Sequence, residues 1–216
     1  MNLFVSGTST GVGKTYVTGL IAQHLVRSGH RVRPHKPICC GDREDVAHLR
    51  DAADRDDLAY DEINPLWLKT PASPLAAAWI ENQELSLTSL LSPIQEAVGQ
   101  APDEWHLVEG AGGWEVPLTE TETLAHLAIA LAFPVLVVVD NKLGALNHTL
   151  LTVHRIQEQG LPIHGIILNQ TEVSRDAASI SNRVVLERVL SVPILGEILH
   201  DATELDFDPF SPSTKP

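Results

Sequence analysis

The chain has 216 residues, of which 44% are hydrophobic, and this is enough to build one α/β domain around a substantial core. We therefore expect a single domain over residues 1–216. The 28 acidic side chains outnumber the 15 basic ones and give a formal net charge of −13. This balance argues against a nucleic-acid partner, because such binding depends on Lys and Arg side chains that neutralise phosphates.

The cysteines and the apolar runs indicate a cytoplasmic protein. Cys39 and Cys40 are adjacent, and adjacent cysteines seldom reach disulfide geometry, so the chain does not resemble a disulfide-rich secreted domain. The N-terminus lacks the charged region that precedes the apolar run of a signal peptide. The longest apolar run, residues 127–139, is too short to span a bilayer and contains Pro134, so we expect no membrane partner.

Short β-branched runs alternate with longer helical patterns, which is typical of an α/β fold with a doubly wound, mostly parallel sheet flanked by helices. We expect strands at residues 3–6, 31–35, 105–108, 134–139, 165–168 and 193–197, and helices at residues 14–28, 147–159 and 176–190. Residues 42–99 contain four prolines that divide the expected helices, so this stretch should form a cap or flank. Residues 201–216 should form an irregular acidic tail.

A phosphate-binding loop follows the first expected strand. Its residues are Gly7-Thr8-Ser9-Thr10-Gly11-Val12-Gly13-Lys14-Thr15, and they lead directly into the first expected helix. In such a P-loop the glycines let backbone N–H groups converge on phosphate oxygens, the lysine reaches the terminal phosphates and the final hydroxyl binds Mg²⁺. Five residues rather than four separate Gly7 from Gly13, so either the loop is one residue longer or Thr8 takes the place of the first glycine.

Three of the five lysines, Lys14, Lys36 and Lys142, come just after expected strands. The carboxyl ends of the strands line the ligand crevice in a doubly wound sheet, so these three lysines could approach one site. For Lys36 the alternative is an ordinary solvated loop lysine.

Acidic residues at two positions could hold Mg²⁺ together with the P-loop hydroxyl, since this ion prefers carboxylate oxygens. Glu109 is the better candidate, because it ends the third expected strand and precedes a flexible run of glycines and alanine, Gly110–Gly113. Asp45 is the second candidate. The alternatives are an exposed acid in a turn for Glu109 and a simple surface carboxylate for Asp45.

The loop at residues 140–147 leads from a buried strand into a helix, and its exposed N–H groups suit a carboxylate ligand. The alternative is an ordinary helix N-cap formed by Asn147, and the two uses can coexist.

Taken together, these motifs resemble the dethiobiotin synthetase family of the P-loop NTPase superfamily, from the N-terminus to about residue 198. The resemblance rests on the P-loop, on Lys36-Pro37, on Val108-Glu109-Gly110-Ala111-Gly112-Gly113-Trp114 with Pro117-Leu118, and on Lys142-Leu143-Gly144 with Asn147-His148. The resemblance implies an ATP-dependent ligase of biotin synthesis that joins CO2 to 7,8-diaminononanoate through a carbamate, with Mg²⁺ as cofactor. It also implies a homodimer.

The resemblance further implies a role for each site residue. Catalysis would fall to Lys14, Lys36 and Thr10. Nucleotide binding would involve Gly11, Val12, Gly13, Lys14, Thr15, Tyr16, Glu109, Gly112 and Asn169, with Asn169 meeting adenine. Mg²⁺ would be held by Thr15, Asp45 and Glu109. Substrate would be bound by Cys40, Gly113, Leu143, Gly144, Ala145 and Asn147, where Cys40 stands in a position that is often serine and the loop at 143–147 acts across the dimer interface.

Two other functions fit a P-loop in this fold. A partitioning-type ATPase switch usually carries an additional lysine early in the loop, and this sequence has none there. A cobyrinate-type amide ligase normally adds a glutamine-hydrolysing domain, for which 216 residues leave no room.

Overall fold

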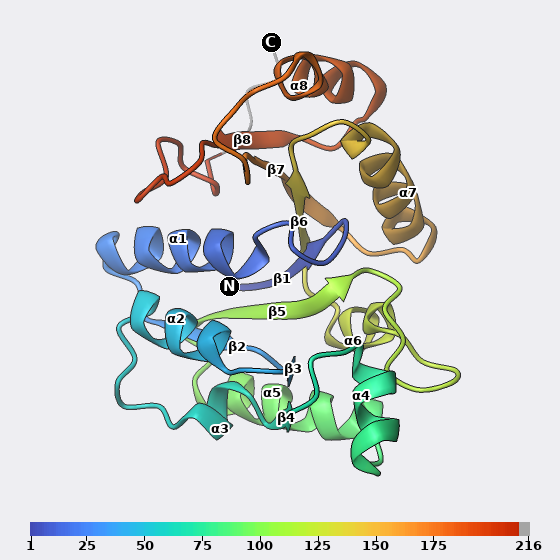
Figure 1. The fold of residues 1–216 in the computed structure, drawn as a ribbon. Helices are drawn as coiled ribbons and strands as arrows, with labels where there is room; N and C mark the ends of the chain where they lie inside the picture. The colour runs from blue at the N-terminus through green and yellow to red at the C-terminus, as the bar shows by residue number, and fades with distance from the viewer. Residues whose placement is uncertain (212–216) are drawn as a thin grey trace.

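A sheet of six parallel strands forms the centre of the computed structural model, which describes residues 1–211 (Figure 1). The strand order is β2, β5, β1, β6, β7 and β8. The strands are β1 (Asn2–Gly7), β2 (Val32–His35), β5 (Trp105–Gly113), β6 (Val135–Asp140), β7 (Ile163–Asn169) and β8 (Ile194–Ile198). Each strand expected from the sequence is present, and the predicted α/β fold is confirmed.

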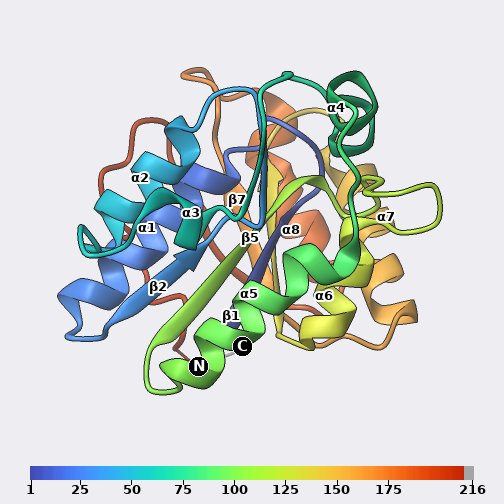
Figure 2. The same cartoon turned by 90° about the horizontal axis from the view of Figure 1, so that it is seen from below.

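Helices cover both faces of this sheet. They are α1 (Lys14–Arg27), α2 (Glu44–Ala52), α3 (Tyr60–Ile63), α4 (Pro74–Glu81), α5 (Leu87–Gln100), α6 (Leu124–Leu131), α7 (Ala145–Glu158) and α8 (Ala177–Val189). Figure 2 shows α1 and α2 on one side of the sheet and α5, α6 and α7 on the other. The sheet is therefore doubly wound, as the alternation of strands and helices predicts.

The central strands β1 and β6 are largely apolar because each supplies two hydrophobic cores. In β1, Leu3 and Val5 pack into the core beneath α1, whereas Phe4 packs into the core on the opposite face. In β6, residues 135–139 alternate between the same two cores, and all are fully buried. Successive side chains of a strand point to opposite faces, so a central parallel strand needs apolar residues at every position.

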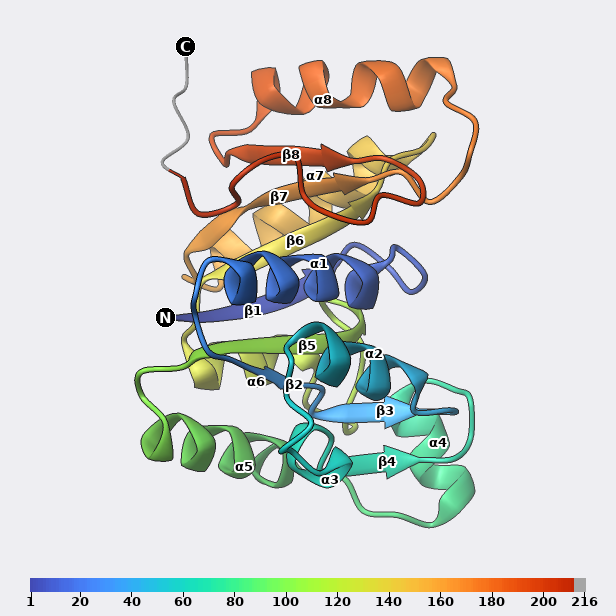
Figure 3. The ribbon, with the colours of Figure 1, turned by 90° about the vertical axis from the view of Figure 1, so that its left-hand side faces the viewer.

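Residues 36–100 flank the main sheet and contain a feature that the sequence did not reveal. A separate two-stranded parallel ribbon, β3 (Ile38–Cys40) and β4 (Leu66–Leu68), lies beyond β2, with α4 beside it (Figure 3). Strands of three residues are too short to show a period-two pattern, which is why they were not predicted. The ribbon carries the chain from Lys36 towards α4, and both places border the candidate site.

Two expected helix boundaries are wrong. Pro93 was expected to divide helices, but α5 runs through it, because Leu90, Ile94 and Ala97 keep one continuous buried face. Helix α7 begins at Ala145 rather than at Asn147.

The acidic tail has no helix or strand over residues 201–211, and its last five residues lie outside the described part. It is nevertheless anchored. The Phe207 ring packs against Gly196 so closely that a Cβ there would clash with it, and the Phe210 and Trp105 ring centroids lie 4.5 Å apart. Within residues 1–211, no helix combines the length and apolarity needed to span a membrane.

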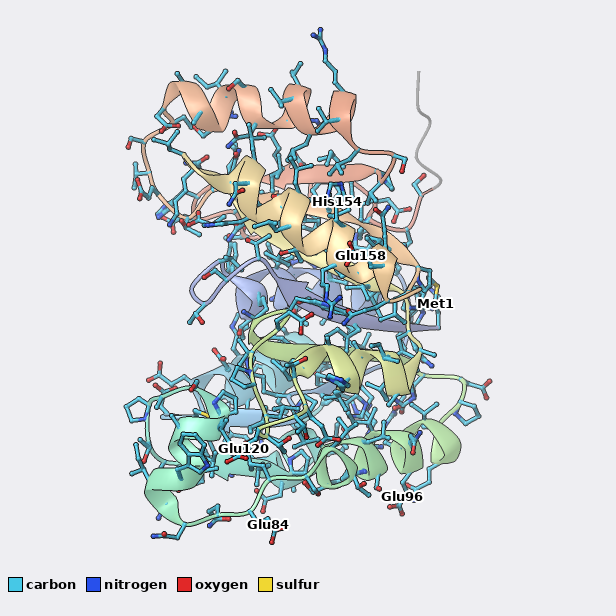
Figure 4. All side chains as sticks on the ribbon, turned by 90° about the vertical axis from the view of Figure 1, so that its right-hand side faces the viewer. Met1, Glu84, Glu96, Glu120, His154 and Glu158 are labelled. Atoms are coloured by element: carbon cyan, nitrogen blue, oxygen red, sulfur yellow. The ribbon has the colours of Figure 1, made fainter. Side chains whose placement is uncertain are left out.

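Acidic side chains project from the face that carries α5 and α7. Figure 4 shows Glu84, Glu96, Glu120 and Glu158 there, and all four are exposed.

Two buried histidines link β2 and β5. His35 Nε2 lies 3.0 Å from His106 Nδ1, and His106 Nε2 lies 2.9 Å from the carbonyl oxygen of Ala101. A carbonyl only accepts, so His106 donates from Nε2 and, as a neutral ring, accepts from His35 at Nδ1. Burial lowers the pKa of both rings, and for His35 the neighbouring His106 adds to the shift.

This pair should make stability depend on pH. The folded-state pKa values lie below the unfolded value of about 6.5, so the stabilisation is fully present above that pH and is lost as the pH falls below it. We expect the melting temperature to fall between pH 7 and about pH 5 with a steeper slope than in a His35→Leu/His106→Leu variant. Equal slopes in differential scanning fluorimetry would contradict this prediction.

Candidate functional site

The P-loop lies between β1 and α1, and two of its glycines adopt a left-handed backbone conformation. β1 ends at Gly7, and α1 begins at Lys14 with Gly13 as its N-cap. Gly11 and Gly13 have φ values of 76° and 82°, a region that other residues rarely adopt. The buried Lys14 side chain turns back over the loop and donates from Nζ to the carbonyl oxygen of Ser9 at 3.3 Å.

Asn169, at the end of β7, braces this loop from the far side. Its Nδ2 donates to the carbonyl oxygen of Val12 at 2.9 Å, and its Oδ1 is buried without a hydrogen-bond partner. The contact is close enough that a Cβ on Gly13 would lie 2.2 Å from the amide nitrogen. Gly13 is therefore required both for its backbone angle and for the approach of Asn169.

Glu109 lies on β5 with no solvent exposure. Its Oε1 accepts a hydrogen bond from the Thr15 hydroxyl at 2.7 Å and an ion-pair contact from Lys36 Nζ at 2.5 Å. Its Oε2 is buried and has no partner among the described residues. A buried carboxylate with one free oxygen is a strong attractor for a cation.

Lys36 reaches this carboxylate from the end of β2, the strand next to β5. Its backbone N–H donates to the carbonyl oxygen of Ile63 at 2.7 Å, and its carbonyl accepts from Asn64 at 2.8 Å, so the lysine is firmly placed. Its Nζ also lies 2.6 Å from Asp45 Oδ2 in the first turn of α2. One ammonium group therefore joins both acids that the sequence marked as metal candidates.

These contacts set the charges of the groups. Burial is the main reason that the pKa of Lys14 falls to about 8; Glu109 opposes this shift and Lys36 adds to it. Burial also acts to lower the pKa of Lys36, but Glu109 and Asp45 outweigh it and raise the pKa above its usual value. Burial acts to raise the pKa of Asp45, yet Lys36 brings it below its usual value. At neutral pH both lysines are mainly protonated and Asp45 is ionised.

Lys14, Lys36, Asp45 and Glu109 all border one open cavity of about 910 Å³ at the carboxyl ends of the strands. The predicted site residues that line it are Thr10, Gly11, Gly13, Lys14, Thr15, Tyr16, Lys36, Cys40, Asp45, Glu109 and Gly112. Such a cavity is large enough for a nucleotide together with a small second substrate. Its chemistry suits a reaction that gathers negative charge next to bound phosphates.

Comparison with known proteins identifies the family. The AAA domain family matches residues 1–203. The ATP-dependent dethiobiotin synthetase of Akkermansia muciniphila is 41% identical over 207 residues, which cover 96% of each chain. That of Methanocaldococcus jannaschii is 35% identical over 210 residues, covering 95% of this chain and 98% of the relative. The chain belongs to the dethiobiotin synthetase family.

Membership of the dethiobiotin synthetase family confirms the predicted ATP-dependent ligase and decides against the partitioning-type switch and the cobyrinate-type ligase. A solved structure of the septum site-determining protein MinD from Pyrococcus horikoshii has a TM-score of 0.59 to this chain and is 19% identical, covering 93% of this chain and 82% of that one. A likeness at this identity shows the fold alone. The P-loop NTPase-like fold predicted from the sequence is thereby confirmed.

Several residues border the cavity without having been predicted for a dethiobiotin synthetase site. They are Ile38, Cys39, Glu44, His48, Pro71, Ala72, Ser73, Pro74, Ala111 and Val116. Ile38 and Cys39 follow Lys36-Pro37, Glu44 precedes Asp45 and Ala111 lies between Glu109 and Gly112, so nearness in sequence to predicted site residues was the available signal for these four. The segment at 71–74 could not have been found, because it reaches the cavity only through the pairing of β3 with β4.

Gly112 and Gly113 lie inside β5, which continues beyond Glu109 where the sequence predicted a flexible turn. The strand persists because Gly113 pairs with Gly7 of β1 across a local register shift. A Cβ on Gly112 would lie 3.2 Å from the Thr10 hydroxyl, so Thr10 and Gly112 face one another. Gly113 packs against the P-loop backbone instead of lining the cavity.

The next residue, Trp114, fixes the end of β5 in place. It is almost fully buried, meets the Phe4 ring edge-on at 6.2 Å and donates from Nε1 to Gln159 Oε1 at 2.7 Å. The glycines at the site are thus held between β1 and the far end of α7.

Cys40 borders the cavity at the end of β3. Burial raises the pKa of its thiol to about 11, and Cys39 and Glu81 add to the shift. The side chain is therefore a neutral thiol at physiological pH rather than a nucleophilic thiolate.

The loop at 142–147 lies outside this cavity, and the expectation that Lys142 joins Lys14 and Lys36 is wrong within one chain. Lys142 instead pairs with Asp140 at 2.6 Å and is 58% exposed. The loop residues Leu143, Gly144 and Asn147 are exposed, and Ala145 is buried. The alternative N-cap role of Asn147 is also wrong, because Gly144, with a φ of 92°, is the N-cap of α7.

The two P-loop glycines should respond differently to alanine. Both have positive φ, but a Cβ on Gly11 has no atom within 4 Å, whereas a Cβ on Gly13 collides with Asn169. We expect Gly11→Ala to lower the free energy of unfolding by about 1 kcal/mol and Gly13→Ala to lower it by roughly 1–2 kcal/mol more, because Asn169 must give up its bond to the loop. Equal losses in urea unfolding would show that Asn169 does not brace the loop.

Proposed function

We propose that this chain closes the cyclic urea of dethiobiotin from 7,8-diaminononanoate and CO2, converting ATP to ADP and phosphate. The observation that carries the proposal is the pair of buried lysines and the Thr15, Asp45 and Glu109 oxygens gathered around one cavity beside a P-loop. Each stage of this reaction produces an anion next to a phosphate. Fixed cations in a partly dehydrated cavity stabilise such anions more strongly than water does.

The reaction consists of three steps that balance in atoms and charge. One substrate amine attacks the carbon of CO2 and loses a proton, which gives a carbamate. A carbamate oxygen then attacks the γ-phosphorus of ATP and expels ADP, which gives a carbamic–phosphoric anhydride. The second amine attacks the carbonyl carbon, loses a proton and expels phosphate, and the cyclic urea closes.

The side chains suit these steps by position and charge. Lys14, at the start of α1, would hold the transferring phosphoryl group, and the protonated Lys36 would pair with the carbamate and the γ-phosphate. Thr10 faces Gly112 at the cavity wall, where the hydroxyl and the backbone can orient the reacting oxygens. Gly11, Val12, Gly13, Thr15 and Tyr16 would bind the nucleotide phosphates, and Gly113 would support the reaction centre through the P-loop. Asn169, which braces the P-loop from outside the cavity, would meet adenine as the family resemblance implies.

Mg²⁺ fits the oxygens of Thr15, Asp45 and Glu109. The buried, unpartnered Oε2 of Glu109 needs a cation or a donor. Among residues 1–211, no group of three or more His, Cys, Asp or Glu side chains could hold a metal ion by itself. Mg²⁺ in proteins typically binds through one or two carboxylates and the substrate phosphates. When bound, it would neutralise charge on the phosphates.

The substrate carboxylate should be bound by the loop of a second subunit. Leu143, Gly144, Ala145 and Asn147 lie outside the cavity of their own chain, although the N-terminus of α7 offers free N–H groups for an anion. Leu143 is 81% exposed, as expected of a residue that a partner covers. A homodimer would bring this loop to the cavity of the partner, where Cys40 would contact the diamine end.

Two free thiols are compatible with the cytoplasm, where we place the enzyme.

The function is tested directly by product formation. Purified protein with Mg²⁺, ATP, bicarbonate and 7,8-diaminononanoate should form dethiobiotin, and ADP release should depend on the diamine. Mass spectrometry of the product and a coupled ADP assay measure both. Rapid ATP turnover without diamine and without dethiobiotin would mean a switch ATPase rather than a ligase.

The shared site is tested by complementation. Lys36→Ala and Asn147→Ala should each lose most turnover as homodimers. A heterodimer of the two variants, isolated with two affinity tags, contains one cavity with an intact lysine facing an intact loop, so it should show about half of the wild-type turnover. An inactive heterodimer would mean that both residues act within the same subunit.

A further inference from the structure

Lys36 lies between the two carboxylates proposed to bind Mg²⁺. Its Nζ is 2.6 Å from Asp45 Oδ2 and 2.5 Å from Glu109 Oε1, and its side chain is only 6% exposed. The Thr15 hydroxyl, the third proposed metal ligand, donates to the same Glu109 oxygen at 2.7 Å. One ammonium group thus contacts one oxygen of each carboxylate, and Glu109 Oε2 has no partner among the described residues.

The ammonium and a metal ion cannot share these oxygens at full strength. Mg²⁺ requires oxygens at about 2.0–2.1 Å, and two cations on one carboxylate oxygen repel each other strongly in a buried site. Glu109 Oε2 is unpartnered and open to a metal, but a metal bound there would share the Glu109 carboxylate with the ammonium of Lys36. The metal would therefore weaken or displace the contacts of Lys36 with Glu109, with Asp45 or with both. A buried ammonium that loses its carboxylates needs another anion, because an unpaired buried charge is highly unfavourable.

A bound nucleotide would offer such an anion on the cavity side of Lys36. Lys36 borders the cavity next to the P-loop and Lys14, where a nucleotide phosphate would lie. A terminal phosphate there could accept the ammonium at the moment the metal takes the carboxylates. The exchange keeps every buried charge paired.

We propose that Lys36 competes with the metal for Asp45 and Glu109, and that it makes metal binding conditional on a nucleotide phosphate that takes over its ammonium group. The inference rests on the proposed function for the position of nucleotide and metal, and it adds a role for Lys36 that precedes the chemistry. Binding energies are reciprocal, so the metal strengthens nucleotide binding by the same factor. Metal binding to Asp45 and Glu109 would also free the ammonium group of Lys36 to contact the nucleotide phosphate.

The test measures Mn²⁺ binding to the full chain by electron paramagnetic resonance, with and without ADP. Wild type should bind Mn²⁺ weakly alone and about tenfold or more tightly with ADP. Lys36→Met should bind Mn²⁺ without ADP about tenfold more tightly than wild type and lose most of the ADP dependence. Lys142→Met is the matched control, because it breaks an ion pair of the same 2.6 Å length outside the cavity, and its Mn²⁺ binding should equal that of wild type.

A second measurement covers the case in which Lys36→Met folds poorly. Its melting temperature without divalent ions should be lower than that of wild type and should rise with Mg²⁺ far more than that of wild type, because the metal replaces the missing cation. Lys36→Met/Glu109→Gln removes both partners and should lose this response. Wild-type values for Mn²⁺ affinity and for the Mg²⁺-dependent melting temperature in Lys36→Met would overturn the inference.

These results separate the inference from the proposed function. Unchanged metal binding in Lys36→Met, alongside normal dethiobiotin formation by wild type, would overturn the competition and leave the function intact. Tighter metal binding in Lys36→Met supports the competition even if wild type forms no dethiobiotin.

Discussion

The carboxylate of Glu109 is fully buried, and the rest of the site is arranged to neutralise it. A carboxylate in the protein interior loses its hydration, and a closely placed cation must replace that stabilisation. Lys36 supplies this cation from β2, and the P-loop supplies the Thr15 hydroxyl from the other side. The arrangement follows from the strand order, because β5 lies between β2 and β1 in the sheet. Lys36, directly after β2, and Thr15, at the end of the P-loop that follows β1, therefore converge on Glu109.

This burial has consequences for chemistry. A charge that is held in place before substrates arrive does not have to reorganise when a carbamate or a phosphate forms. Lys36 stays protonated because of Glu109 and Asp45, whereas Lys14, which is farther from a direct partner, has a pKa of about 8. The two lysines thus differ in how readily they can give up an anionic partner. Lys14 is ready for the phosphates, and Lys36 must first exchange partners.

Much of the site was predictable because parallel strands end at one edge of the sheet. Glu109 and Lys36 were identified from their positions at the ends of two strands, and the P-loop from its glycines and lysine, before any distance was known. Asp45 was the second metal candidate from the sequence, and the family resemblance added Thr10 and the role of each residue. The same strand-end rule wrongly predicted that Lys142 approaches the site of Lys14 and Lys36. Lys142 follows a strand as they do, but its side chain pairs with Asp140. The strand-end rule gives the edge of the sheet and does not give the direction of a side chain.

The features that were not predicted from the sequence depend on long-range packing. The ribbon of β3 and β4 brings residues 71–74 to the cavity, and strands of three residues carry no pattern of their own. Helix α5 continues through Pro93 because its buried face outweighs the local penalty of proline, which a local rule cannot weigh. The fold itself is shared with the septum site-determining protein MinD at only 19% identity, so the fold alone does not identify the activity. The assignment as an ATP-dependent ligase comes from the residues around Glu109 and from the relatives at 35–41% identity.

In the proposed reaction, ATP phosphorylates an oxygen derived from CO2. This step is tested most directly by turnover with ¹⁸O-labelled bicarbonate and mass spectrometry of the inorganic phosphate. Attack of a carbamate oxygen on the γ-phosphorus, followed by expulsion of phosphate from the carbonyl carbon, predicts that each phosphate released carries one ¹⁸O atom from the bicarbonate. Dethiobiotin formed together with unlabelled phosphate would mean that water attacks ATP, and it would contradict the account.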